Sequence, residues 1–157
     1  MANKTLALYD RMRRWPAGHW LFTRAICFKA PYFASISPKI EALEPGRCEV
    51  TLRHRRKVTN HIGTVHAIAL CNMAELAGGM MTEVSLPDSM RWIPKGMTVE
   101  YVKKAVGTMR AVATPAIPVV ESDEAYALPV HVVVADPKGD TVFRATISMW
   151  LSPKRPS

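Results

Sequence analysis

One long apolar segment, residues 60–84, constrains the fold more than any other feature of the sequence. Its apolar residues recur at all angles of a helical projection; examples are Val65, Ile68, Leu76 and Val84. A helix that is apolar on nearly every side must be enclosed by the rest of its domain. The sequence therefore predicts a central helix rather than a surface helix.

The polar exceptions in this helix fall on one narrow stripe. Asn72, Glu75 and Thr82, with Gly79 between them, are three or four residues apart and so share one helix face. Glu75 is the carboxylate in the middle of the helix. This stripe is the candidate working face.

Length and charge limit the possibilities. A chain of 157 residues, 48% hydrophobic, suits one domain, which we divide into a helical segment 1–32 and a core 33–151. The net charge of +8 suits nucleic acid, an acidic membrane surface or a phosphorylated small molecule. Nucleic-acid binding is not expected, because the basic residues are scattered and form no recognised motif.

Cysteine and histidine spacing indicates neither a disulfide framework nor a metal site. The three cysteines are an odd number at wide spacing, which predicts small buried side chains in a reducing compartment. The histidines outside the long helix lack metal-ligand spacing, so no metal is expected; they are His19, His54, His61 and His131. We find no signal-peptide core and no apolar run long enough to span a membrane, and we expect a cytoplasmic protein.

The remaining patterns predict two short helices and a set of strands. Helices are expected at 4–14 and 17–28, an edge strand with a break at 33–43, and a hairpin turn at 44–47 followed by a strand. After the long helix, four further strands are expected, at 96–105, 107–114, 126–135 and 141–151. The aromatic residues of the amino-terminal quarter suit either core packing or a lid over an apolar channel.

A basic cluster precedes the long helix. His54, Arg55, Arg56 and Lys57 suit either a solvated strand end or contact with an anionic ligand, because guanidinium groups pair well with phosphate oxygens.

An apolar helix preceded by a hairpin and followed by antiparallel strands predicts an α+β fold in which the sheet curls around the helix. The local sequence adds a resemblance: Asn60, Gly63, His66 and Glu75 stand where acyl-CoA thioesterases of the PaaI-like group carry Asn, Gly, His and an acidic residue. The stretches WPAGHWLF, LEPGR, MAELAGG and VEYVKKA are most similar to an uncharacterised branch of that superfamily. The resemblance implies the hotdog fold, an antiparallel sheet wrapped around one long helix.

The resemblance also implies a function and a set of site residues. It implies hydrolysis of an acyl-CoA or acyl-carrier thioester by a homodimer or homotetramer, with coenzyme A as part of the substrate and no other cofactor. The implied catalytic groups are Glu75 as base or nucleophile, the Ala67 N–H as oxyanion donor, and Asn60 and His66 at the helix entrance. The implied substrate-binding residues are Gly63, Ile68, Arg55, Arg56, Lys57, Lys103 and Lys104.

The chemistry can be checked on the residues themselves. A carboxylate in an apolar helix is desolvated, which makes it a stronger base, and a helix start presents free N–H groups to an oxyanion. His66 and Glu75 are nine residues apart, about 13 Å along a helix, and cannot share one carbonyl. We therefore expect one subunit's helix start to meet the helix middle of another, which requires a dimer.

Several alternatives remain at this level. The chain has His66-Ala67-Ile68 where the enzymes usually have His-Gly-Gly, which adds bulk at the thioester and favours a non-catalytic acyl-CoA or lipid-binding protein. Lys103 can pair with Glu75 or bind a ligand anion. Glu75 suits an interface carboxylate, His66 a cap and Asn60 a turn residue. A dehydratase or hydratase is the least favoured class, because the Gly-His-Phe-Pro stretch of such enzymes is absent.

Overall fold

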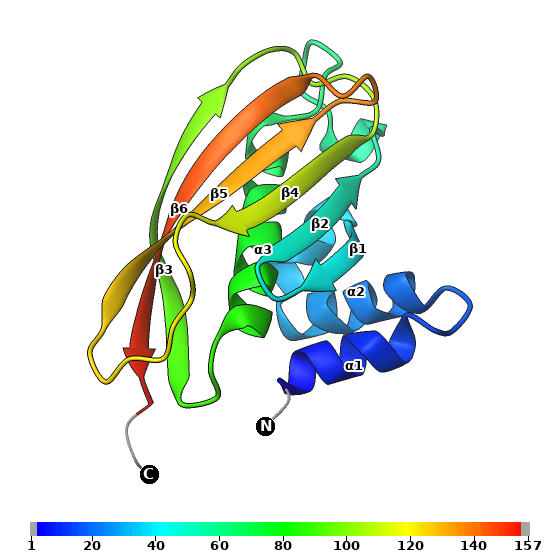
Figure 1. Ribbon diagram of the computed structural model, residues 1–157. Helices are drawn as coiled ribbons and strands as arrows, with labels where there is room; N and C mark the ends of the chain where they lie inside the picture. The colour runs from blue at the N-terminus through cyan, green and yellow to red at the C-terminus, as the bar shows by residue number, and fades with distance from the viewer. Residues whose placement is uncertain (1–2, 155–157) are drawn as a thin grey trace.

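Within residues 3–154, which the computed structural model describes, one antiparallel sheet of six strands has the order β1-β2-β4-β5-β6-β3 (Figure 1). The strands are β1 (Lys39–Glu44), β2 (Arg47–Leu52), β3 (Met90–Tyr101), β4 (Met109–Pro115), β5 (Tyr126–Ala135) and β6 (Thr141–Pro153). Inward-facing side chains alternate along the strands, as in β5, where Leu128, Val130, Val132 and Val134 are fully buried.

The long helix α3 (Ala67–Ser85) lies against one face of this sheet (Figure 1). Met73, Ala77 and Met81 have no exposed surface, so the predicted central helix is confirmed. Gly78 allows the close approach of α3 to β6, because a Cβ atom there would lie 2.7 Å from Cδ1 of Ile147.

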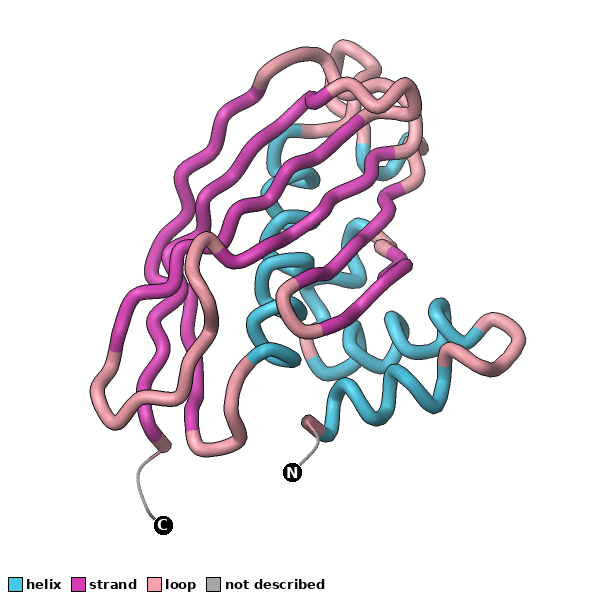
Figure 2. Tube along the Cα trace, in the orientation of Figure 1, coloured by secondary structure: helices cyan, strands magenta, loops and turns pink. Residues whose placement is uncertain are grey.

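The amino-terminal segment forms two helices and a short 3-10 helix beside β1 (Figure 2). These are α1 (Lys4–Met12), α2 (Gly18–Lys29) and η1 (Pro31–Ile36). The two predicted helices are present with small shifts at their ends. The predicted strand at 33–43 is wrong in its first part: Pro31 begins η1, and the chain becomes extended only after Ser37, whose φ of 47° ends the turn.

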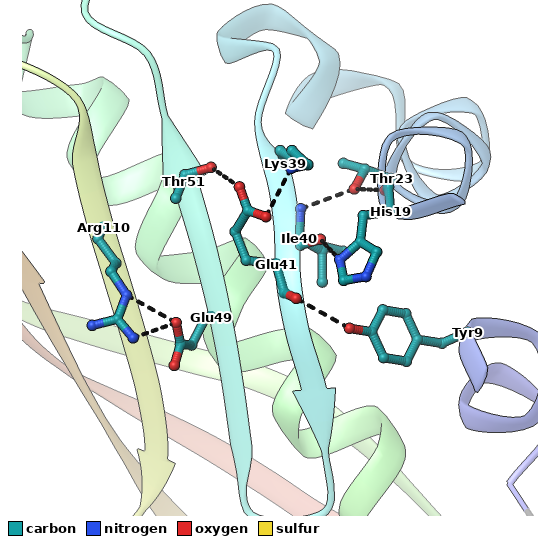
Figure 3. Close-up of polar contacts among 9 residues, drawn as sticks. All are labelled: Tyr9, His19, Thr23, Lys39, Ile40, Glu41, Glu49, Thr51 and Arg110. Atoms are coloured by element: carbon teal, nitrogen blue, oxygen red, sulfur yellow. Dashed lines mark hydrogen bonds and ion pairs between the residues drawn. The ribbon is translucent and has the colours of Figure 1, made fainter. Parts of the chain in front are cut away.

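The β1 edge of the sheet is closed by side chains from α1 and α2 (Figure 3). Thr23 accepts a hydrogen bond from Ile40 N–H at 2.9 Å, and the Tyr9 hydroxyl donates to the Glu41 carbonyl at 3.2 Å. His19 Nδ1 lies 3.3 Å from the Ile40 carbonyl oxygen. Burial raises the pKa of Tyr9, so its hydroxyl remains a donor. The amino-terminal helices therefore satisfy backbone groups that an edge strand would expose.

The β3 edge is open in the single chain. Among residues 3–154, β3 pairs with β6 alone, and most of its side chains are exposed. Ile93 and Tyr101 keep 58% and 49% of their surface, although both are large and apolar in part.

The strands after α3 follow the sequence patterns closely. The hairpin of β5 and β6 has the predicted bounds at its start and turn, whereas β3 begins six residues before the predicted strand at 96–105. No helix in the described part of the chain has the length and apolar character needed to cross a bilayer.

Candidate functional site

Glu75 lies in the middle of α3 with its carboxylate exposed. Among residues 3–154 the carboxylate of Glu75 takes part in no hydrogen bond and no ion pair. The apolar enclosure expected from the sequence is therefore not provided by its own chain. An unpaired carboxylate on a helix that is otherwise buried is available for chemistry or for a partner.

A hollow of about 310 Å³ opens beside Glu75, which we call the mid-helix hollow. Its apolar walls come from the amino-terminal segment, α3 and β3, namely Ile26, Phe33, Leu76, Met80 and Trp92. Lys29 and Glu83 add charge at its rim. The hollow thus places apolar surface next to a carboxylate, the combination that an acyl group and a hydrolytic base require.

Trp92 is a wall residue of this hollow that the sequence did not identify. Its indole N–H donates to the Glu83 carboxylate at 2.8 Å, and its ring covers Gly79, where a Cβ atom would lie 3.0 Å from the ring. Gly79 in the polar stripe indicated that a large group packs closely on the helix. The group itself, Trp92, comes from β3 and cannot be identified from the helix sequence alone.

The start of α3 has the geometry of a capped helix. His66 is the N-cap, and its Nδ1 accepts a hydrogen bond from Ile68 N–H at 3.1 Å. The neighbouring Ala67 N–H has no acceptor among the described residues. Ile68 keeps 56% of its side chain exposed at this entrance. The Ala67 N–H is therefore available to an oxyanion or another acceptor, whereas the Ile68 N–H is already occupied.

Asn60 organises the loop before α3. Its Oδ1 accepts hydrogen bonds from Ile62 N–H at 3.1 Å and Thr64 N–H at 3.0 Å, and its Nδ2 donates to the Thr64 hydroxyl at 2.9 Å. Gly63 has a φ of 77°, which favours glycine. In this geometry Asn60 holds the turn, and a direct role toward substrate remains a prediction.

A second hollow, of about 220 Å³, lies beside the helix start. This helix-start hollow is lined by His66, Ile68, Asn72, Lys57 and Tyr32, among others. Asn72 is 6% exposed; its Nδ2 donates to the Ser35 hydroxyl at 3.2 Å, and its buried Oδ1 has no partner among the described residues. Asn72 is a polar residue of the predicted stripe that was not placed in the predicted site.

The basic cluster before α3 divides between two hollows. Lys57 faces the helix-start hollow, whereas Arg55 lines a separate cleft and donates to the Ile36 carbonyl at 3.0 Å. Arg56 is exposed. The structure thus brings Lys57, but not the whole cluster, next to His66.

Lys103 does not pair with Glu75 within the chain. It lies 2.6 Å from Asp140 and 3.1 Å from Asp136 in the turn between β5 and β6. The hydrogen bonds to these two carboxylates hold the pKa of Lys103 above its ordinary value. An internal Lys103–Glu75 pair is therefore excluded as a description of this chain; Lys104 beside it is exposed.

One further pair near the stripe escaped sequence reasoning. Cys71 Sγ lies 3.2 Å from the Tyr101 hydroxyl, one helical turn before Glu75. The hydrogen bond with Cys71, together with burial, raises the pKa of Tyr101 to about 12. Tyr101 is thus a neutral hydroxyl at physiological pH, on the open β3 edge. In the part of the chain described here, no group of three or more His, Cys, Asp or Glu side chains can hold a metal ion.

Comparisons with known proteins identify the family. The model of the domain of unknown function DUF4442 matches residues 18–151. The chain belongs to this family. It is also similar to a crystal structure of the genomics target APC5556, with 46% identity, a TM-score of 0.81 and coverage of 96% of this chain and 98% of that chain.

More distant structures share the fold. A Pseudomonas aeruginosa protein of unknown function, described as a probable thioesterase, is 22% identical, with a TM-score of 0.71 over 82% of this chain and 91% of that chain. A Haemophilus influenzae thioesterase is 12% identical, with a TM-score of 0.67 over 78% of this chain and 82% of that chain. No curated protein matches the sequence. These structures confirm the predicted fold, an antiparallel sheet wrapped around one long helix. The match to a family of unknown function confirms the predicted resemblance to an uncharacterised branch.

Proposed function

We propose that the protein is a thioesterase that hydrolyses an acyl-CoA or acyl-carrier thioester at a site shared by two subunits. The observation that carries the proposal is the exposed, unpaired Glu75 carboxylate at an apolar hollow, on the same helix as the unpartnered Ala67 N–H. The distant relatives described as thioesterases support the same chemistry.

The reaction needs a base and an oxyanion donor. Glu75 accepts a proton from water as the water oxygen attacks the thioester carbonyl carbon. The resulting oxyanion accepts a hydrogen bond from the Ala67 N–H, for which the helix start adds a positive dipole end. When the carbon–sulfur bond breaks, the proton held by Glu75 passes to the leaving thiolate. Acid and free thiol are the products.

Two subunits are required because the two groups are far apart in one chain. Ala67 and Glu75 are eight residues apart, roughly 12 Å along the helix. The open β3 edge offers a place for a second copy, because two such edges can join into one continuous sheet. In our proposal the partner's helix start approaches Glu75 and supplies the enclosure that its own chain lacks.

We assign binding of the coenzyme A end of the ligand to the basic residues near the helix start. Lys57 lines the helix-start hollow and Arg56 is exposed next to it, so both can meet phosphate oxygens of coenzyme A. Three free cysteines agree with a reducing, cytoplasmic compartment.

A second candidate function is binding of acyl-CoA without hydrolysis. It is favoured by Ile68, whose side chain stands exposed at the helix entrance and whose N–H is already occupied by His66. An oxyanion site with one donor instead of two stabilises the transition state less.

Release of free CoA, followed chromatographically over short, medium, long and aromatic acyl-CoAs, separates the two functions. We expect release by the wild-type protein and a loss of about 10²–10⁴-fold in Glu75→Gln. Glu44→Gln, an exposed carboxylate at the end of β1, serves as the matched control and should keep full activity. Tight binding of a thioether analogue without any release would instead establish the binding protein.

A further inference from the structure

The outer face of α2 exposes large apolar side chains. Trp20, Leu21 and Phe28 keep 53%, 38% and 90% of their surface, and they share one side of the helix with Arg24. Trp15 before α2 and Tyr32 after it are 53% and 70% exposed. A group of exposed aromatic residues of this size marks an interaction surface. We call Trp20, Leu21 and Phe28 of α2 the aromatic face.

The segment that carries this face is uniformly basic. Residues 11–40 contain no Asp or Glu, and their cations are Arg11, Arg13, Arg14, Arg24, Lys29 and Lys39. Among residues 3–154, Arg24, which shares the side of α2 with Trp20 and Phe28, forms no ion pair. The face therefore combines apolar tips with unneutralised positive charge.

A basic cleft of about 820 Å³ adjoins the aromatic face. It lies between α2 and the start of the β1–β2 hairpin, and its cations are Arg24, Lys39, Arg53 and Arg55, with Trp20 also in its lining. Glu41 is the carboxylate of the cleft, and it is bound by Lys39 at 2.8 Å and by the Thr51 hydroxyl at 2.8 Å (Figure 3). The charge of Glu41 is thus balanced by Lys39, and the arginines of the cleft are available to bind an anion from outside the protein.

A second copy of the chain fits this face poorly. In a two-fold contact this face meets the same face of the other copy, so Arg24 would lie near like charge, and residues 11–40 have no carboxylate to offset it. An anionic surface meets both properties of the face, since aromatic side chains settle at the boundary of headgroups and acyl chains while arginines bind phosphates.

We propose that the aromatic face and the basic cleft dock the protein on an anionic phospholipid surface. α2 lies along the membrane plane, with Trp20, Leu21 and Phe28 in the headgroup boundary and Arg24 and Arg53 on lipid phosphates. Figure 1 shows α1 and α2 beside β1, and β1 and β3 are the two opposite edge strands of the sheet. Docking therefore leaves the β3 edge free for a partner subunit, and the inference goes beyond the proposed thioesterase reaction.

Vesicle co-flotation of the full chain tests this. We expect binding to vesicles of phosphatidylcholine and phosphatidylglycerol in equal amounts, at least about 10-fold weaker binding to phosphatidylcholine alone, and loss of binding at high salt. The double variant Trp20→Ser and Phe28→Ser should bind the anionic vesicles about 10-fold or more weakly than the wild type. Arg24→Glu should weaken binding to the anionic vesicles and leave the weak binding to phosphatidylcholine alone unchanged.

Ile117→Ser is the matched control, because Ile117 is an exposed apolar residue outside the face, at 44% exposure. It should bind as the wild type does, and circular dichroism should show that all variants are folded. Equal binding to neutral and anionic vesicles, or none to either, would overturn the proposal. So would a wild-type oligomer that Trp20→Ser and Phe28→Ser reduces to a smaller species, because a second copy would then cover the face.

Discussion

The two edges of the sheet differ in how their backbone groups are used. At the β1 edge, Thr23, Tyr9 and His19 from the amino-terminal helices meet the polar groups of Ile40 and Glu41 (Figure 3). At the β3 edge no described residue does the same, and large side chains stay exposed. An edge that is closed from within stabilises the fold, and an edge left open is available for assembly.

The difference also separates two kinds of carboxylate. Glu49 of β2, next to the closed edge, is 8% exposed and is held by Arg110 at 2.8 Å and by Arg47. Glu75, on the side of α3 whose neighbours include Trp92 of β3, has no partner among residues 3–154. A fully paired carboxylate contributes to stability, whereas an unpaired one is free to accept a proton from water.

The largest expected effect comes from blocking the open edge. Ile93→Lys combined with Met97→Lys places charges on exposed positions of β3, and lysine on an edge strand opposes pairing with a second copy. We expect a monomer and a loss of CoA release of about 100-fold or more, because in our proposal two subunits build each site. Light scattering after size exclusion, with the CoA assay, measures both.

The matched control places lysines on exposed apolar positions away from β3, namely Val133 and Ile117. That variant should keep the wild-type oligomeric state and activity. A fully active monomer of the β3 variant would show that the open edge does not serve the site.

A smaller effect is expected at the closed edge. Thr23 is 1% exposed, donates to the His19 carbonyl at 2.7 Å and accepts from Ile40 N–H. Thr23→Val keeps the shape but removes both bonds and leaves a buried N–H unsatisfied, so the free energy of unfolding should fall by about 1–3 kcal/mol. Urea denaturation measures this, and the oligomeric state should not change. An unfolding free energy equal to that of the wild type would mean that α2 does not hold this edge.

The smallest effect is expected for alkylation of Cys48, which lies in the β1–β2 hairpin and should not react in the folded protein. Burial raises the pKa of Cys48 to about 12, and burial also raises the pKa of Cys27. Their reactive thiolates form only as the pH approaches these raised values, so neither should be alkylated between pH 7 and 9 in the folded protein. Peptide mapping should find the partly exposed Cys71 modified first and the other two only in urea. Rapid alkylation of Cys48 at neutral pH would show that the hairpin opens.

The sequence predicted those features that depend on periodicity within one element. The apolar circumference of the predicted segment 60–84 located α3, and strict alternation located β5 and β6. His66 was placed at the helix entrance by the family resemblance, and the capping role that the structure shows was one of the alternatives for it. Only the first part of the strand predicted at 33–43 is wrong: Phe33 to Ile36 alternates in hydrophobicity, but Pro31 begins a helical turn there, and β1 follows from Lys39.

Site geometry was less accessible because it depends on contacts far apart in the sequence. Lys103 is neutralised by Asp140, 37 residues away, and Trp92 reaches α3 from β3. The exposure of Glu75 was not expected either, because an apolar helix predicts burial on all sides unless a partner covers one of them. Which surfaces a second chain covers is not encoded in any local pattern.

The central claim is that two subunits share each site, and a mixed dimer tests it most directly. Glu75→Gln removes the base. Ala67→Pro removes only the free N–H: proline is favoured at the first helical position, and the preceding His66 has φ −64° and ψ 139°, which proline tolerates. Ala67→Gly keeps the N–H and should keep the activity.

Each variant alone should be about 100-fold or more below the wild type in CoA release. The two are then co-expressed with different tags, and the mixed dimer is purified through both. Our account predicts about half of the wild-type activity per dimer, because one of the two shared sites has both its Ala67 N–H and its Glu75. A mixed dimer as inactive as its parents would contradict it and place both groups of each site in one chain.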